Sequence, residues 1–140
     1  MEPLLYIDEN LRGLARWLRF LGFDTEVASG GRSDEDLLAQ AKAEGRLLIT
    51  RDRDLFGRAG VFWLSENTTR EQLTRVLAEI GRPDEARWFS RCTVCNEPLH
   101  EISREGVPGE FDRYWRCNAC ERTYWRGSHY DRAKKFLGGA

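Results

Sequence analysis

The chain has 140 residues, 32% of them charged, and a formal net charge of −1. This length fits one ordinary domain, or one domain and a small module, and the near-neutral charge does not by itself indicate nucleic acid. No apolar run approaches the roughly 20 residues that a membrane helix needs, and the first ten residues lack the basic start of a signal peptide. We therefore expect a cytoplasmic protein with no membrane partner.

Short apolar runs alternate with segments of helical periodicity along the first 81 residues. Strands are expected at residues 4–8, 23–29, 46–52 and 60–65. Helices are expected from Asn10 to Gly22, from Ser33 to Gly45, and from Thr68 or Thr69 to Gly81, where the first residue of each is the candidate N-cap. In the first helix, Arg12, Arg16 and Arg19 lie on a different face from the leucines. The order β-α-β-α-β-β-α predicts an α/β fold with a mostly parallel sheet.

The composition changes after residue 81. We assign residues 1–81 to the α/β domain, residues 82–91 to a linker, and residues 92–140 to a small module with four cysteines and a basic, aromatic end. Residues 1–90 hold 13 Lys and Arg against 16 Asp and Glu, whereas residues 91–140 hold 9 against 7. The positive charge is thus gathered in the second module.

Acidic residues follow two of the predicted strands. Asp8 ends the first strand and Asp52 the third, and ligands of open α/β sheets bind outside the carboxyl ends of the strands. Asp54 lies two residues further, and Asp34 and Asp36 begin a helix that can reach the same edge. Such carboxylates repel one another unless a cation neutralises them, and Mg²⁺ or Mn²⁺ prefers oxygen ligands. The plain alternative is that these acids cap helices and confer solubility.

The four cysteines form two Cys-x-x-Cys pairs, with 21 residues between the second and the third cysteine; the residues are Cys92, Cys95, Cys117 and Cys120. Two such pairs can complete a tetrahedral zinc site, and four protein ligands make the zinc structural. A redox pair is the alternative, but two pairs without a thioredoxin pattern favour zinc. The intervening length suits a β-hairpin.

The segment from Arg122 to Lys135 mixes bases with aromatic rings. Aromatic rings stack on unpaired bases, and Arg and Lys contact phosphates, so this segment is a candidate for RNA contact. The alternative is that Tyr124 and Trp125 fill the small core of the zinc module while the basic side chains are merely solvated.

Several motifs occur together in a specific order. They are Asp8-Glu9-Asn10-Leu11, Leu14-Ala15-Arg16-Trp17-Leu18-Arg19, Gly22-Phe23-Asp24, Thr50-Arg51-Asp52-Arg53, the two Cys-x-x-Cys pairs and Tyr124-Trp125-x-Gly127-Ser128-His129. In this order they resemble the Mut-seven carboxy-terminal RNase domain family, over nearly the whole chain.

The resemblance implies a PIN-like, three-layer nuclease domain fused to a C4 zinc ribbon, with metal-dependent ribonuclease activity. It implies catalytic roles for Asp8 and Asp52, which would hold Mg²⁺ or Mn²⁺, and for Asp34 and Asp54, with Asp36 as a substitute for Asp34. The expected partner is single-stranded RNA. The residues expected to contact it are Arg16, Arg51, Arg53, Arg126, Ser128, His129 and Lys134.

Two functions from different classes follow. In the first, the protein hydrolyses RNA phosphodiester bonds with a metal-activated water. In the second, it is a non-catalytic RNA-binding or adaptor protein that uses the zinc ribbon. The acids at two strand ends favour the enzyme, because carboxylates repel phosphate unless a metal intervenes.

Overall fold

The computed structural model describes residues 3–84, 87–103, 113–125 and 128–138, and for residues 128, 129 and 138 it describes the backbone only. The strands are β1 (Leu4–Ile7), β2 (Thr25–Val27), β3 (Arg46–Thr50), β4 (Val61–Trp63), β5 (Leu99–Ile102), β6 (Tyr114–Cys117) and β7 (Thr123–Trp125). The helices are α1 (Arg12–Phe20), α2 (Asp34–Glu44), α3 (Thr69–Ile80) and α4 (Ser128–Gly138), with short 3-10 helices η1 (Glu9–Leu11) and η2 (Arg53–Leu55). Within these residues, no helix combines the length and hydrophobicity of a bilayer-spanning segment.

The first four strands form one sheet in the order β2-β1-β3-β4, and every neighbouring pair is parallel. This confirms the predicted α/β class. Because β1 and β3 are neighbours with Ile7 aligned to Ile49, their carboxyl ends meet at the same edge. The residues that follow these two strands are therefore placed side by side.

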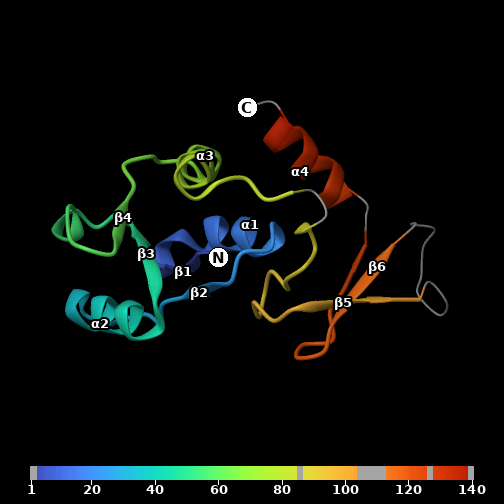
Figure 1. The fold of residues 1–140 in the computed structure, drawn as a ribbon, viewed down its shortest axis with the longest axis horizontal. Helices are drawn as coiled ribbons and strands as arrows, with labels where there is room; N and C mark the ends of the chain where they lie inside the picture. The colour runs from blue at the N-terminus through green and yellow to red at the C-terminus, as the bar shows by residue number, and fades with distance from the viewer. Residues whose placement is uncertain (1–2, 85–86, 104–112, 126–127, 139–140) are drawn as a thin grey trace.

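Alternating side chains give the sheet two covered faces. Leu5, Ile7 and Ile49 are buried in a cluster with residues of α1 and α3, whereas Tyr6 and Leu48 are buried in a second cluster with residues of α2. In Figure 1, α2 accordingly lies on one side of the sheet, and α1 and α3 lie on the other. The three layers expected from the sequence are present.

Capping residues fix the helix ends. The hydroxyl of Ser33 accepts a hydrogen bond from the N–H of Asp36 at the start of α2, and Gly45 ends that helix with φ +66°. The expected cap at Asn10 is wrong: Asp8 instead caps η1 by accepting from the N–H of Asn10. The helix α1 then continues from η1 without a side-chain cap.

The second module is an antiparallel sheet with the order β5-β6-β7, which confirms the expected hairpin between the cysteine pairs. The helix α4 was not expected. Tyr130 and Ala133 are buried, and Phe136 and Leu137 pack on the same core, at the spacing of one helical face. The ring of Phe136 stacks on Trp17 of α1 at 4.7 Å between centroids.

One hydrophobic cluster joins the two modules. Phe89 lies inside the segment expected to be a linker, yet its side chain is only 3% exposed, and its N–H donates to the carbonyl of Phe20. The Phe89 ring contacts Phe20 edge-on at 4.6 Å and stacks on Trp115 of β6 at 4.8 Å. Phe89, with Trp88 partly buried beside it, therefore packs as part of the core between α1 and the cysteine module.

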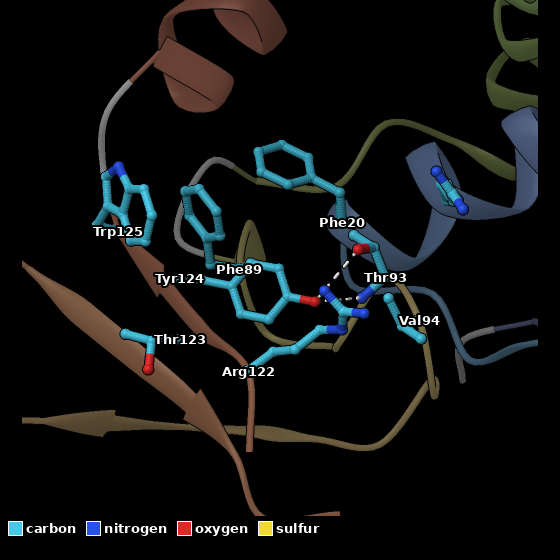
Figure 2. A pocket seen from close by; sticks show the side chains of 9 residues that line it. Phe20, Phe89, Thr93, Val94, Arg122, Thr123, Tyr124 and Trp125 are labelled. Carbon is cyan, nitrogen blue, oxygen red and sulfur yellow. Dashed lines mark hydrogen bonds between the residues drawn. The ribbon is translucent and has the colours of Figure 1, made fainter. Parts of the chain in front are cut away.

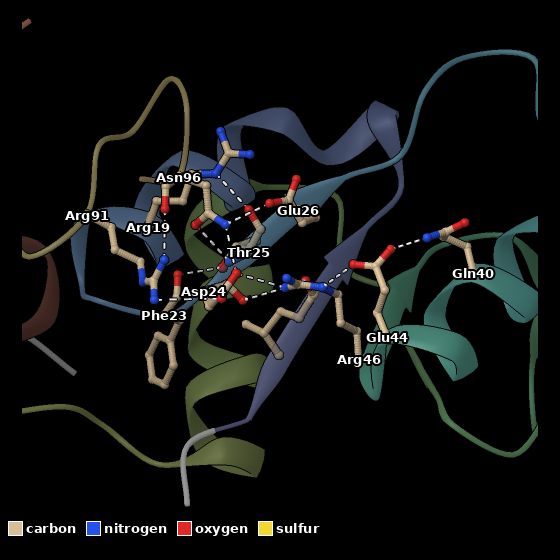
Figure 3. A network of polar contacts seen from close by, with 11 residues as sticks. Arg19, Phe23, Asp24, Thr25, Glu26, Gln40, Glu44, Arg46, Arg91 and Asn96 are labelled. Atoms are coloured by element: carbon tan, nitrogen blue, oxygen red, sulfur yellow. Dashed lines mark hydrogen bonds and ion pairs between the residues drawn. The ribbon is translucent and has the colours of Figure 1, made fainter. Parts of the chain in front are cut away.

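A polar junction also links β2 to the first cysteine turn (Figure 3). Arg19, expected on a different helix face from the leucines, is 8% exposed and donates to the carbonyls of Thr25, Thr93 and Val94. Asn96 accepts from the buried N–H of Thr25 at 2.9 Å. Because β2 is an edge strand, the Asn96 side chain takes the place of a further strand at this position.

Asn96 also binds the acids on either side of Thr25. Its amide nitrogen donates to Asp24 at 2.8 Å and to Glu26 at 3.1 Å. Burial opposes ionisation of Asp24, but hydrogen bonds from Asn96 and Arg46 overcome it and lower the Asp24 pKa. The junction thus holds an ionised carboxylate between the sheet and the cysteine turn.

Candidate metal centres

The four cysteines converge at one end of the small sheet. Their sulfur atoms all lie within 4.8 Å of one another, with Sγ–Sγ distances of 3.6 Å for Cys92–Cys95 and Cys92–Cys120, and 3.7 Å for Cys95–Cys117. Tetrahedral zinc with Zn–S bonds of about 2.3 Å requires sulfur atoms about 3.8 Å apart. A disulfide would bring two of them to about 2.0 Å, and all four are free. The donor set and its spacing fit zinc.

The thiols differ in their tendency to ionise. Burial opposes ionisation of Cys92, but hydrogen bonds from Tyr124 and from the N–H groups of Cys95 and Val94 lower its pKa to about 6. The pKa of Cys95 is raised, first by its contact with Cys120 and then by burial. Four thiolates this close repel one another, so the cluster ionises completely only around a cation.

The acids expected at the sheet edge also converge. Carboxylate oxygens of Asp34, Asp52 and Asp54 lie within 4.8 Å of one another, and these three residues are called the acid group below. Asp52 follows β3, Asp54 lies in η2, and Asp34 is the first residue of α2. Asp36 is not in the acid group: it lies two residues further into α2, where its N–H donates to the hydroxyl of Ser33.

Asp8 is held beside the acid group by Thr50. The buried hydroxyl of Thr50 donates to Oδ2 of Asp8 at 3.0 Å and accepts from the N–H of Asp52 at 3.1 Å. The other oxygen of Asp8 accepts from the N–H of Asn10, as Oδ1 of Asp52 does from Asp54. Sequence reasoning missed Thr50, although a threonine between an apolar strand and an aspartate is a signal for such a role.

The carboxylates repel one another. Burial, a hydrogen bond with Asp52, and the charges of Asp52, Asp54 and Asp8 raise the pKa of Asp34. Asp8 is thus within electrostatic reach of the acid group, even though its oxygens lie outside the 4.8 Å set. A set of carboxylate oxygens under mutual repulsion is the donor chemistry that Mg²⁺ and Mn²⁺ accept, and the residues fit such a cation.

Two of the arginines expected to contact RNA flank the acid group in sequence. Arg51 donates to Oδ1 of Asn67 at 2.6 Å, and Arg53 is exposed in η2. Arg16 is exposed on α1. Lys134 is exposed on α4, with its ammonium 5.7 Å from the centre of the Tyr130 ring. The RNA-binding roles of these four residues stay predictions.

The remaining expected RNA contacts fall at the start of α4. Arg126 lies outside the described residues. The backbones of Ser128 and His129 begin α4, and their side chains also lie outside the description. The roles of these three residues stay predictions.

A comparison with protein-family models decides the family. The model described as Mut7-C RNAse domain matches residues 3–137. The chain belongs to the Mut7-C RNAse domain family. In this Mut7-C RNAse domain, the match includes the acid group, Asp8 and all four cysteines, so the resemblance seen in the sequence is confirmed. Comparisons with curated proteins and with solved structures gave no match.

Proposed function

We propose that the protein is a ribonuclease that hydrolyses phosphodiester bonds of single-stranded RNA in the cytoplasm, with Mg²⁺ or Mn²⁺ at the acid group and structural zinc on the cysteines. The observation that carries this proposal is the convergence of Asp52 and Asp54, which follow β3, with Asp34 at the start of α2. Membership of a family described by RNase activity supports the same conclusion.

The four acids have two tasks in this proposal. Asp34, Asp52 and Asp54 would hold the cation, and Asp8, fixed by Thr50, would orient the site from β1. A bound Mg²⁺ or Mn²⁺ would supply positive charge for the phosphoryl oxygens and activation of the attacking water. The carboxylates alone would repel the phosphates of RNA. The scissile phosphate can therefore approach the acid group only when a cation neutralises the charge of the carboxylates.

The zinc would have a structural role. Four cysteine ligands leave no open position for substrate, which is the arrangement of structural sites. The cysteine turns hold the strands β5–β7 and, through Arg19 and Asn96, the edge of the large sheet. A reducing cytoplasm keeps such cysteines available as metal ligands.

A matched pair of variants on one helical turn tests the proposal. Asp34→Asn should lower the rate of cleavage of labelled single-stranded RNA at least about 100-fold, because even the loss of a supporting residue around a metal costs about 10–100-fold. Asp36→Asn, on the same helix but outside the acid group, should cleave like the wild type. Chelation should abolish wild-type cleavage, and Mn²⁺ should restore it.

The competing function is RNA binding without cleavage. It predicts that both variants and the wild type bind RNA and that none cleaves it in Mn²⁺. Equal cleavage by wild type and Asp34→Asn would instead place the activity elsewhere. Either result would contradict the proposal.

A further inference from the structure

A cavity of about 460 Å³ opens where α1 faces the zinc module. Figure 2 shows the rings of Phe20, Phe89, Tyr124 and Trp125 around it, and Arg16 and Arg122 complete the charged part of its lining. This volume lies within the range of about 300–1,000 Å³ that ligand pockets occupy. The lining is aromatic and positively charged, and it contains no Asp or Glu among the described residues.

A second cavity of about 350 Å³ continues the first along α1. The two share Arg16, Phe20 and Thr93, and the second adds Arg132 of α4 and Trp17. No acidic residue lines the second cavity within the described part of the chain. The two cavities together are called the α1 groove below. Its three arginines make it a site for an anion that also has a flat apolar part.

The rings of the α1 groove differ in exposure. Phe20 and Phe89 are buried and form its base, whereas Trp125 is 39% exposed on the last strand of the zinc module. Tyr124 is anchored, because its hydroxyl accepts from the N–H of Thr93 and contacts the sulfur of Cys92. Trp125 is therefore the most exposed of the rings that line the groove, on a wall that the cysteine site holds in place.

We propose that the α1 groove binds a single-stranded segment of the RNA substrate away from the bond that is cut. A base stacks on Trp125, and Arg16, Arg122 and Arg132 contact the phosphates. Aromatic rings and arginines together recognise single strands in this way, without reading the base sequence. This inference rests on the proposed function and adds to it the place where the substrate is held.

The position of α1 connects the groove to the acid group. The helix begins four residues after Asp8, so its first turn lies at the edge of the sheet where the acids converge. From Arg12 to Phe20 it extends about 12 Å along its axis. An RNA strand in the α1 groove therefore runs along the helix that leads away from the acid group. To reach both the groove and the acid group, this RNA must be longer than one phosphodiester unit.

Binding of a labelled 12-nucleotide single-stranded RNA, measured by fluorescence anisotropy without added divalent cation, tests the inference. Trp125→Ala should weaken binding about 5- to 150-fold, the range that corresponds to loss of one base–aromatic stack. Trp125→Phe should retain most of the affinity. Arg16→Ala with Arg122→Ala should reduce the slope of log K against log salt by about 1.4, since each phosphate contact on a single strand contributes about 0.7.

Arg116→Ala is the matched control, because Arg116 is exposed on β6 outside the α1 groove. It should bind RNA like the wild type. Zinc content and melting temperature establish that each variant is folded. Wild-type affinity in the folded Trp125→Ala variant and in the double arginine variant would overturn the inference. Equal affinity of the wild type for a duplex of the same length would also overturn it, because paired bases cannot stack on Trp125.

A minimal phosphodiester separates this inference from the proposed function. Bis(p-nitrophenyl) phosphate in Mn²⁺ requires the acid group but not the α1 groove. The groove variants should hydrolyse it at the wild-type rate while their KM for RNA rises. If the wild type hydrolyses neither substrate, the proposed function fails, and the binding measurement still decides whether the groove holds RNA.

Discussion

Replacing Asn96 with glycine should separate the sheet edge from the cysteine turn. Asn96 has φ +68°, which glycine adopts without strain, so the loss reports the side chain alone. The change leaves the N–H of fully buried Thr25 without its acceptor, at a cost of about 1–3 kcal/mol, and removes the amide donor of Asp24 and Glu26. Because the side chains of Asp24 and Glu26 are partly exposed, water replaces part of the lost hydrogen bonding. We expect the free energy of unfolding to fall by about 2–4 kcal/mol in total.

The assay is thermal unfolding of the zinc-loaded protein. For a chain of this size, each kcal/mol lost from the free energy of unfolding lowers the melting temperature by roughly 3 °C. The melting temperature of Asn96→Gly should therefore fall by about 6–12 °C. Glu121→Gly is the matched control, because Glu121 follows the second cysteine pair as Asn96 follows the first. Its φ is +63°, and its N–H donates to Cys117 as that of Asn96 donates to Cys92. Glu121 is exposed, so its replacement should leave the melting temperature unchanged or slightly raised.

The pH dependence gives a second check on Asn96→Gly. The Asp24 pKa is lowered in the folded protein, so its contribution to stability is present above the ordinary carboxyl pKa and is lost as pH falls through the folded value. Asn96 donates to the ionised form of Asp24. The difference in melting temperature between Asn96→Gly and the wild type should therefore become smaller as Asp24 becomes protonated. Equal melting temperatures for Asn96→Gly and Glu121→Gly would refute the reasoning.

Three further predictions concern the two candidate metal centres. Elemental analysis should find one tightly held zinc in the wild type and none in Cys117→Ser, which should also lose most of the roughly 10–16 kcal/mol that such a site contributes to folding. The circular dichroism of Cys117→Ser should still show the helices of the α/β domain. Thr50→Val should destabilise the protein by about 1–3 kcal/mol in denaturant unfolding and slow RNA cleavage about 10–100-fold, because Asp8 and Asp52 both lose their partner. Asp34→Asn should raise the melting temperature without divalent cation at pH 7, since it removes repulsion; no increase would contradict the crowding of these acids.

The order of the first seven β-strands and α-helices could be predicted because each has a clear local pattern. The alternation of apolar runs with helical periodicity is a property of neighbouring residues, and so are caps such as Ser33 and Thr68. The grouping of the four cysteines could be predicted equally well, because their spacing is itself the signal. The choice between Asp34 and Asp36 could not be predicted, because it depends on which carboxylate lies near the end of β3 and not on the helix that both residues share.

What could not be predicted depends on contacts between distant residues. Trp88 and Phe89 looked like part of a linker because a short polar stretch surrounds them, but Phe89 packs between Phe20 and Trp115. The helix α4 was read as a basic, aromatic RNA-binding segment, since Tyr130 stands among arginines and lysines, although Tyr130 faces the core. A helical pattern of period 3.6 in this segment was the signal that could have shown the helix.

Some buried polar contacts have no sequence signal at all. Arg19 lies in a helix with two exposed arginines at related positions, yet its guanidinium reaches the carbonyl of Thr93 across 74 residues of chain. Asn96 reaches Thr25 across 71 residues. These hydrogen bonds form only when the two modules pack against each other. The local pattern of residues around Arg19 or Asn96 therefore does not indicate the partner.

The central claim is that the acid group holds the cation that cleaves RNA. A crystal of the zinc-loaded protein soaked in Mn²⁺ tests it most directly, with anomalous scattering used to tell manganese from zinc. The account predicts manganese bound by Asp34, Asp52 and Asp54, with zinc confined to the four cysteines. Manganese at another site, or an empty acid group in protein that cleaves RNA in the same Mn²⁺ buffer, would contradict it.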